Sequence, residues 1–400
     1  MKNQAVMILT KTKIINFIII VCLYFAAIFG LNETLNPIAL YFFIPLAFVI
    51  SFLRSGLKVN NSLKLLILLY LWIAFTCFFA YDKELAMREL RQVLGCFLLS
   101  FIISQNTKYE TMTPWLFGVY IVLFIAAIYY CTTHIIDSNF SIGSDRVNDS
   151  NINANTLAYY LLFTITSTFF LTDMVKKVFW KNLFRALFWL MFPIAFWVAI
   201  FTASRQVLVT SMPLLFMLTY VRYFRNKGSK AFWLFFVIAI AVIASAPKIL
   251  SIYENSYLKQ RNELDIYEDS RLALLVDAFH VGMEHPWVGV GPGNYIAFSY
   301  NRHFSHCTYT ELFANTGILG ALLYITMMVR YMRQQRNWFR KTKDDFFIAS
   351  LLWGFIYIIY NFLYSFYENL WLISYYVLVA SYTKHYYESR HGNMLCFNSK

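Results

Sequence analysis

The chain has 400 residues, of which 59% are hydrophobic and 14% charged, with a formal net charge of +13. Soluble domains are about 45–50% apolar, so this composition excludes an ordinary soluble globular protein. Apolar blocks of about 18 or more residues recur along the chain, and they predict an all-α, polytopic helical membrane protein rather than a barrel of alternating strands.

We expect about twelve membrane-spanning helices. They lie at residues 14–32, 34–53, 63–80, 91–105, 113–131, 154–173, 183–202, 207–221, 231–247, 311–330, 346–364 and 369–384. The first follows Lys2, Lys11 and Lys13 and has only a poor version of a signal-peptidase site, so it is expected to be an uncleaved helix. An even number of spans places both termini on the same side.

The distribution of charge predicts which side that is. With the N-terminus in the cytoplasm, 24 of the 34 Lys and Arg residues but only five of the 21 Asp and Glu residues fall in cytoplasmic segments. This bias follows the positive-inside rule. The basic charge is therefore a topology signal that faces anionic lipid headgroups, and no nucleic-acid partner is expected.

Three connecting segments on the outer side are long, at residues 81–91, 132–153 and 248–310. The first has helical spacing, and we expect it to lie at the interface or to extend the next helix outward. Its Asp82 and Glu84 are weak candidates for a divalent-cation site. The second is rich in Asp, Asn and Ser and predicts a loop. No internal repeat is evident, which argues against a transporter built from inverted halves.

The third segment carries most of the remaining polar residues. Residues 270–283 have apolar side chains at helical spacing, with Ser270 as a candidate N-cap and Arg271 in the first turn. The sequence Pro-Trp-Val-Gly-Val-Gly-Pro-Gly-Asn at 286–294 predicts a system of tight turns, in which glycines permit positive φ angles. It has neither the strand context nor the lysine of a nucleotide-binding glycine loop.

Two arginines are candidates for binding an anion. Arg205 lies in Thr202-Ala-Ser-Arg-Gln206, between two apolar blocks, where a charge costs about 2.5–3.5 kcal/mol on insertion scales. It either anchors the outer end of a helix by snorkelling or binds a phosphate through its planar guanidinium. Arg271 either joins Arg205 at a pyrophosphate or pairs locally with Glu268 and Asp269.

His306 is the best candidate for a general base, because an imidazole accepts a proton near neutral pH. His280, His285 and His303 compete with it, and an ordinary solvated loop histidine is the alternative. The histidines do not form a zinc-binding pattern, so no metal is expected. The six cysteines show no CxxC spacing, although a Cys131–Cys307 bridge is conceivable if both residues face an oxidising compartment.

Three motifs in order along the chain resemble the O-antigen polymerase and ligase superfamily. They are Thr202-Ala-Ser-Arg-Gln206, then Pro286-Trp-Val-Gly-Val-Gly-Pro-Gly-Asn-Tyr295, then His306-Cys-Thr-Tyr-Thr-Glu-Leu-Phe-Ala-Asn-Thr-Gly-Ile-Leu-Gly320. The strongest similarity covers about residues 190–330. The family often has His-Asn where this chain has His306-Cys307, so this chain departs from the family pattern at that position.

The resemblance implies a metal-independent, inverting glycosyltransferase of the GT-C kind in the bacterial inner membrane, with a periplasmic active site and no cofactor. Its donor would be an undecaprenyl-pyrophosphate-linked glycan, and its acceptor a glycan or lipid A-core. A chain-length regulator and a flippase are further candidate partners. The residues implied are His306 as the catalytic base, with Arg205, Arg271, Tyr309 and Glu311 as substrate-binding residues.

We favour a polymerase of O-antigen or capsule repeats, with an O-antigen ligase as the alternative and a flippase for lipid-linked glycans as the second alternative. A flippase needs polar residues along a path through the bilayer, whereas the ionisable residues here gather outside the spans. The expected organisation has N-terminal helices at residues 1–185, the signature region at 186–330, and C-terminal helices with a cytoplasmic tail at 331–400.

Overall fold

The computed structural model describes residues 2–32, 34–56, 59, 61–137, 154–225, 247–248, 250–259, 270–299 and 302–391, and the regular structure in these ranges is helical throughout. The predicted all-α class is confirmed for this part of the chain. The chain divides into two compact units. Unit 1 comprises Met1–Val122, Ser270–Gln334 and Asn361–Lys400, and unit 2 comprises Leu123–Asp269 and Gln335–Tyr360.

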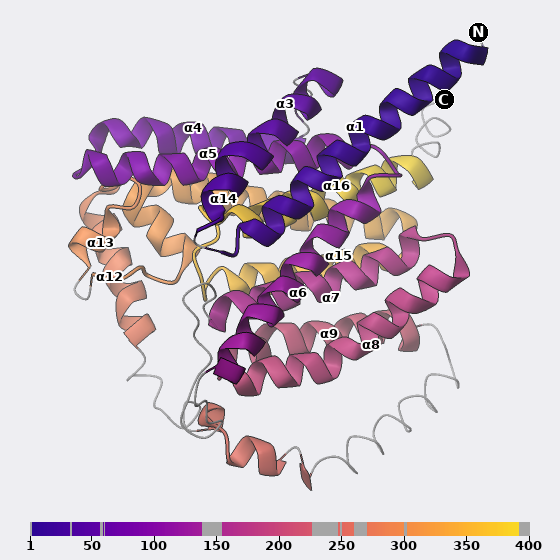
Figure 1. The fold of residues 1–400 in the computed structure, drawn as a ribbon. Coiled ribbons are helices and arrows are strands. Elements are labelled where there is room, and N and C mark those ends of the chain that lie inside the picture. Colours follow the sequence, from indigo (N-terminus) through magenta and orange to yellow (C-terminus); the bar gives the residue numbers. More distant parts are fainter. Residues whose placement is uncertain are drawn as a thin grey trace. The chain divides into compact units, whose positions relative to one another are not determined.

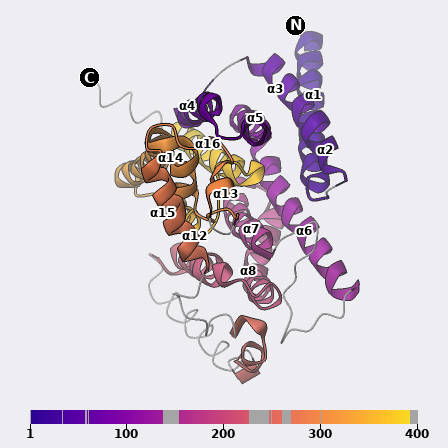
Figure 2. The same ribbon diagram turned by 90° about the vertical axis from the view of Figure 1, so that its left-hand side faces the viewer.

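Unit 1 is built around α5, which contacts α3, α4 and α16. Its elements are α1 (Lys2–Phe29), α2 (Asn36–Ile38), η1 (Ala39–Phe43), α3 (Ile44–Ser55), α4 (Asn61–Thr76), η2 (Cys77–Phe79), α5 (Lys83–Asn106), the start of α6 (Thr113–Asp137), α12 (Ser270–Glu284), α13 (Tyr295–Phe298), most of α14 (Thr308–Thr342) and α16 (Leu370–His391). Figure 1 shows α4 and α5 alongside each other, and Figure 2 looks along them.

Unit 2 holds the remaining helices. They are the rest of α6, α7 (Ala154–Met174), α8 (Val178–Phe201), η3 (Val207–Ser211), α9 (Met212–Thr219), η4 (Tyr220–Phe224), the end of α14 and α15 (Asp345–Tyr360). Helix α7 packs against α8, and α9 packs against α15.

Seven helices of the described residues are long and apolar enough to cross a membrane. They cover Thr12–Phe29, Asn36–Ser55, Thr113–Thr133, Asn155–Met174, Val178–Phe201, Val207–Phe224 and Thr308–Thr342, and Leu63–Phe79 and Asp345–Tyr360 are shorter apolar helices. These helices indicate an integral membrane protein. Each predicted span except 231–247 coincides with a helical element. Most of 231–247 lies outside the described residues, so the number of twelve stays a prediction.

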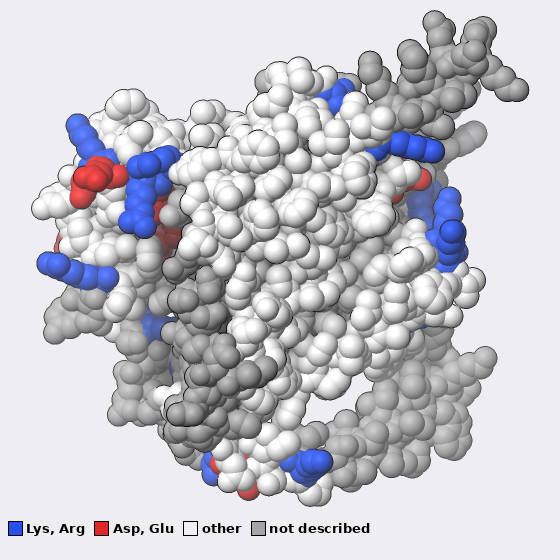
Figure 3. All heavy atoms as spheres, in the orientation of Figure 1, with Lys and Arg blue, Asp and Glu red and all other residues white. Residues whose placement is uncertain are grey.

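The segment at residues 81–91 extends a helix, as expected. Helix α5 begins at Lys83, and the Asp82 side chain caps it by accepting hydrogen bonds from the backbone N–H groups of Glu84 and Leu85. Exposed charged side chains of both signs lie on its first turns. In Figure 3, charges of both signs gather over this end of α4 and α5, and an uncharged surface continues along the helices. This pattern is typical of a helix that emerges from a bilayer.

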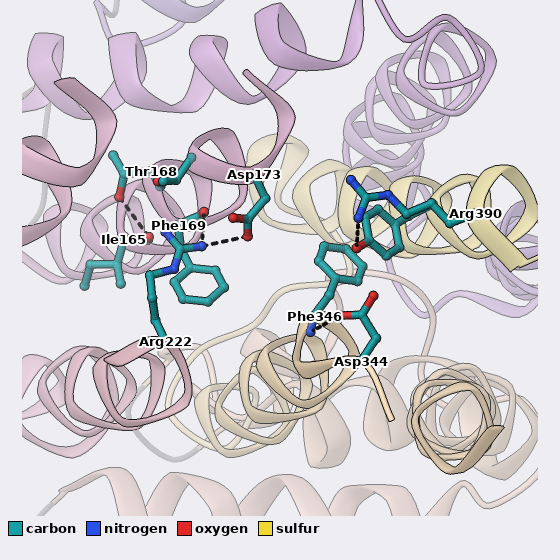
Figure 4. A network of polar contacts seen from close by, with 10 residues as sticks. Ile165, Thr168, Phe169, Asp173, Arg222, Asp344, Phe346 and Arg390 are labelled. Atoms are coloured by element: carbon teal, nitrogen blue, oxygen red, sulfur yellow. Dashed lines mark hydrogen bonds and ion pairs between the residues drawn. The ribbon is translucent and has the colours of Figure 1, made fainter. Parts of the chain in front are cut away.

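In unit 2, an ion pair joins α7 to η4. Arg222 Nη2 donates to Asp173 Oδ2 at 2.7 Å and to the Phe169 carbonyl at 2.9 Å, and its guanidinium lies over the Phe169 ring (Figure 4). Arg225 pairs with Asp345 at 2.7 Å. Both pairs join residues that the charge count assigns to the cytoplasmic side, so they are consistent with the predicted topology.

Helix α14 is broken inside its candidate membrane span. At Gly317 the backbone leaves helical geometry, with φ 71° and ψ −174°. The break frees carbonyl groups of the preceding turn from their usual helical partners. Two of these carbonyl groups accept hydrogen bonds from the glycine-rich turn at residues 286–294. Val290 N donates to the Ala314 carbonyl at 2.9 Å, and Gly291 N donates to the Asn315 carbonyl at 3.0 Å.

Two further hydrogen bonds satisfy backbone groups on either side of the break. Trp72 Nε1 on α4 donates to the Thr316 carbonyl at 2.8 Å. On the other side of the break, Ile318 N donates to the Pro286 carbonyl at 2.8 Å. Irregular backbone at membrane depth is tolerated only where protein satisfies its polar groups. The turn after α12 therefore serves as the hydrogen-bonding partner of the broken helix.

Gly317 tests this interpretation against a matched control. A side chain at Gly317 would overlap the Trp287 carbonyl oxygen, whereas Gly56 has a similar backbone (φ 62°, ψ −170°) and no atom within 4 Å. Alanine at either position adds backbone strain, but only Gly317→Ala adds overlap, which costs about 1–3 kcal/mol more. Thermal unfolding in detergent should show the larger loss for Gly317→Ala. Equal losses of stability would contradict the inference that the turn after α12 packs closely against the break at Gly317.

Candidate functional site

The glycine-rich turn at 286–294 packs directly onto two helices of unit 1. Gly289, Gly291 and Gly293 have φ angles of 68°, 101° and 69°, so the predicted role of these glycines as turn formers is confirmed. A Cβ atom at Gly289 would overlap the backbone of α14, one at Gly291 would overlap Ala80, and one at Gly293 would overlap Glu89. The turn thus fills the space between α14 and the start of α5 with its backbone.

Asn294 fastens the turn to the cap of α5. Its Oδ1 accepts from Asp82 N at 2.6 Å, and its Nδ2 donates to the Asp82 carbonyl at 3.1 Å. Tyr81 N donates to the Val290 carbonyl at 3.0 Å. The Asp82 carboxylate accepts two backbone N–H groups at the cap, and the divalent-cation site at Asp82 and Glu84 stays a prediction.

Asn315 connects four parts of unit 1. Its Oδ1 accepts from Tyr295 N at 2.8 Å, and its Nδ2 donates to the Tyr367 hydroxyl at 3.1 Å. The buried Tyr295 hydroxyl lies 2.9 Å from the Leu274 carbonyl and 3.1 Å from Asp277 Oδ2, both on α12. Helices α12, α13 and α14 and the segment before α16 are therefore held together through one amide side chain and one phenol.

His306 lies two residues before α14, in a backbone conformation that favours glycine, with φ 55°. Its side chain is half-buried. The preceding residue is fixed by Glu311, whose Oε2 lies 3.0 Å from Ser305 N and 2.8 Å from Ser305 Oγ. Cys307 N in turn donates to Ser305 Oγ at 3.1 Å. A buried carboxylate thus holds the backbone on both sides of the histidine.

Thr308 ties this loop to the segment between α15 and α16. Its backbone N–H donates to the Asn361 carbonyl at 2.8 Å, and its hydroxyl donates to the Tyr364 carbonyl at 2.7 Å. Phe366 N donates to the same hydroxyl at 2.9 Å. The left-handed residue at 306 is therefore set between two anchored neighbours, an arrangement in which local strain persists.

The other predicted substrate-binding residues of unit 1 differ in exposure. Helix α12 begins at Ser270, as expected, and Arg271 in its first turn is half-buried. Tyr309 is half-buried, with its ring centroid 4.6 Å from that of Phe362. Glu311 is 1% exposed, and its observed contact is the one with Ser305. Binding of substrate by these residues stays a prediction.

Three carboxyl groups lie close together behind the turn. Glu89 on α5 is buried, and its Oε2 has no hydrogen-bond partner. The half-buried Glu368 lies within hydrogen-bonding reach of Glu89. Burial, reinforced by the negative charges of Glu311 and Glu89, raises the pKa of Glu368 well above its ordinary range. Glu368 therefore keeps its proton to higher pH than an exposed glutamate does.

Sequence reasoning gave no role to four of these residues. Asn294 follows Gly293 directly, and Asn315 lies two residues before Gly317; a polar residue close to a motif glycine was the available sequence signal. Glu89 falls on a helix whose exposed charges gave no indication of a buried acid. Glu368 lies in a short connection between two apolar blocks, and only the tertiary structure brings it to Glu89.

Arg205 belongs to unit 2. Its motif forms a break between α8 and η3, where the buried Ala203 has φ 45°. Thr202 Oγ1 donates to the Val198 carbonyl at 2.6 Å, and Tyr360 donates to Gln206 Oε1 at 3.1 Å. Arg205 is half-buried. Arg271 and His306 belong to unit 1, so the convergence of the three residues stays a prediction.

The cysteines and the candidate metal ligands complete the comparison with the sequence. Cys131 and Cys307 are both buried, and they belong to unit 2 and unit 1, respectively, so the conceivable bridge between them stays a prediction. In the described part of the chain, no group of three or more His, Cys, Asp and Glu residues could hold a metal ion.

The family model described as O-Antigen ligase matches residues 186–325. This range contains all three motifs up to the middle of α14, and it confirms the resemblance to the O-antigen polymerase and ligase superfamily. No curated protein matches the chain. Glu89 and Glu368 lie outside the matched range.

The raised pKa of Glu368 predicts how stability changes with pH. The unfolded chain loses this proton near the ordinary value of 4.5, whereas the folded chain keeps it. Stability should therefore fall as pH rises from about that value towards the higher folded pKa. Glu368→Gln, which stays neutral, should flatten this fall in thermal unfolding curves. The exposed Glu84→Gln should leave it unchanged, and parallel curves for all three proteins would contradict the assignment.

Proposed function

We propose that this chain, whose residues 186–325 match the O-antigen ligase family, is a membrane glycosyltransferase that polymerises lipid-linked surface polysaccharide repeats on the periplasmic face. The observation that supports the proposal is the backbone conformation of His306. A non-glycine residue is held at positive φ by the Ser305–Glu311 and Thr308 contacts, inside the matched range. Backbone strain of this kind is found disproportionately at functional sites.

The proposed reaction transfers a glycan from undecaprenyl pyrophosphate to a hydroxyl group. The acceptor oxygen attacks the anomeric carbon, the bond from that carbon to the pyrophosphate oxygen breaks, and undecaprenyl pyrophosphate leaves. The hydroxyl proton passes to His306, which must lie about 3 Å from the acceptor oxygen or reach it through one water. Attack opposite the leaving group inverts the anomeric configuration, and the reaction needs no nucleotide sugar or cofactor.

The two arginines would offset the charge that develops on the departing pyrophosphate. Arg271 is suited to this role because it stands in the first turn of α12, where backbone N–H groups also favour an anion. Arg205 directly follows the break after α8. Tyr309 and Glu311 are proposed to bind the substrate beside His306.

A ligase that moves finished glycan onto lipid A-core is the alternative, and it has the support of the matched family, which is described as O-Antigen ligase. Both reactions use the same donor and differ in the acceptor. A chain-length regulator and a flippase are proposed partners of a polymerase. The second alternative, that the chain is itself a flippase, requires no proton acceptor and gives no reason for the strained histidine.

His306→Ala should abolish transfer while the protein stays inserted and folded, because it removes the base and leaves the Ser305–Glu311 and Thr308 contacts in place. Removing a general base lowers the rate of the chemical step by about 10²–10⁴-fold. Glycan length in cells that express the variant, together with transfer from lipid-linked donor in proteoliposomes, measures this effect. The exposed neighbour His303→Ala is the matched control. Undiminished transfer by His306→Ala would rule out the base role.

A strain that lacks the gene distinguishes polymerase from ligase. Single repeats still attached to the acceptor are expected for a polymerase. A bare acceptor with accumulated lipid-linked polymer would indicate a ligase instead. Lipid-linked repeats retained on the cytoplasmic face would indicate a flippase and would overturn both transferase proposals.

A further inference from the structure

Helix α12 has three distinct faces. The first is packed into unit 1: Leu274, Ala278 and Val281 are buried, and the last two belong to a core cluster with Val290, Tyr295 and Ala314. Their spacing of four and three residues places them in one row along the helix. This face anchors α12 to the glycine-rich turn and to α14.

The second face is apolar but exposed. Leu272, Val276, Phe279 and Met283 are 42%, 44%, 48% and 58% exposed, respectively. Their spacing of four, three and four residues also makes a single row. Trp287, three residues after the helix ends, is 77% exposed. A third face, with the exposed His280 and Glu284, is polar.

The exposed apolar row adjoins α14. Gly282 packs against the Phe313 ring, and the Phe279 and Phe313 centroids are 5.9 Å apart. Beyond the break, α14 has its own exposed apolar row within a candidate membrane span, made of Ile318, Leu319, Leu322, Ile325 and Val329. The Ile318–Pro286 bond places Trp287 beside the start of that row. The two rows and Trp287 therefore form one continuous apolar surface.

The direction of α12 fits an interfacial position. Figure 1 shows it running across the direction of α4 and α5, which belong to the same unit. A helix that crosses the spanning direction, with an apolar row on one side and polar groups on another, matches the boundary between lipid and water. Exposed tryptophan is typical of the headgroup level.

We propose that α12 lies in the outer interface of the bilayer, with Leu272, Val276, Phe279 and Met283 against lipid chains and Trp287 among the headgroups. The occupant of this surface is bulk lipid, because the row continues the lipid-facing surface of α14. This contact does not depend on the transferase activity. It holds Arg271, directly before Leu272, at headgroup level.

Spin labels on the full-length protein in vesicles of phosphatidylethanolamine and phosphatidylglycerol test the proposal. Single cysteines replace Val276 and Phe279 on the apolar row, and His280 and Glu284 on the polar face serve as matched controls. The unsubstituted chain gives the background from its native cysteines. Accessibility of each label to oxygen, which concentrates in lipid, and to a water-soluble nickel chelate is then compared. No glycan substrate is present, so the outcome is independent of the proposed function.

The labels at 276 and 279 should be accessible to oxygen and shielded from nickel, whereas the labels at 280 and 284 should be accessible to nickel. Labels at 276 and 279 that are accessible to nickel would place the row in water and overturn the proposal. Labels shielded from both reagents would mean that protein covers the row, which also overturns it. Spin–spin broadening in that case would identify the cover as a second copy of this chain.

Discussion

The break of α14 at Gly317 is the constraint on which the rest of unit 1 depends. A span that loses its helical geometry must have its freed carbonyls satisfied by protein, since lipid offers no donors. Val290, Gly291 and Trp72 supply them. This requirement explains why the turn after α12 has glycine at 289, 291 and 293, because a Cβ atom at these positions would overlap α14, Ala80 and Glu89. The turn then fixes where α12 lies.

The part of α14 that precedes the break also positions the His306 loop. The break lies eleven residues after His306, and the turn of α14 between them carries Glu311 and Asn315 on its buried side. Glu311 holds Ser305, and Asn315 holds Tyr295 and Tyr367. The histidine is therefore supported by residues that also secure the broken helix. A rigid support of this kind is what a positioned base requires.

Sequence alone predicted the helical class, the start of α12 at Ser270 and the role of the glycines, because these depend on local periodicity and backbone freedom. It did not predict the break in α14, since Gly317 within an apolar block reads as an ordinary helix position. It also gave no indication of the meeting of Glu89 and Glu368, which lie on distant segments. Contacts between distant segments follow from tertiary packing, and one chain without its relatives carries no record of them.

The central claim is that Arg205, Arg271 and His306 act on one pyrophosphate-linked donor. A cryo-electron microscopy structure of the chain in lipid nanodiscs with undecaprenyl pyrophosphate tests it most directly. The account predicts that both guanidiniums contact the pyrophosphate and that the His306 imidazole faces the adjoining acceptor space, within reach of a hydroxyl directly or through one water. A pyrophosphate bound away from both arginines, or His306 beyond the reach of a bridging water, would contradict it.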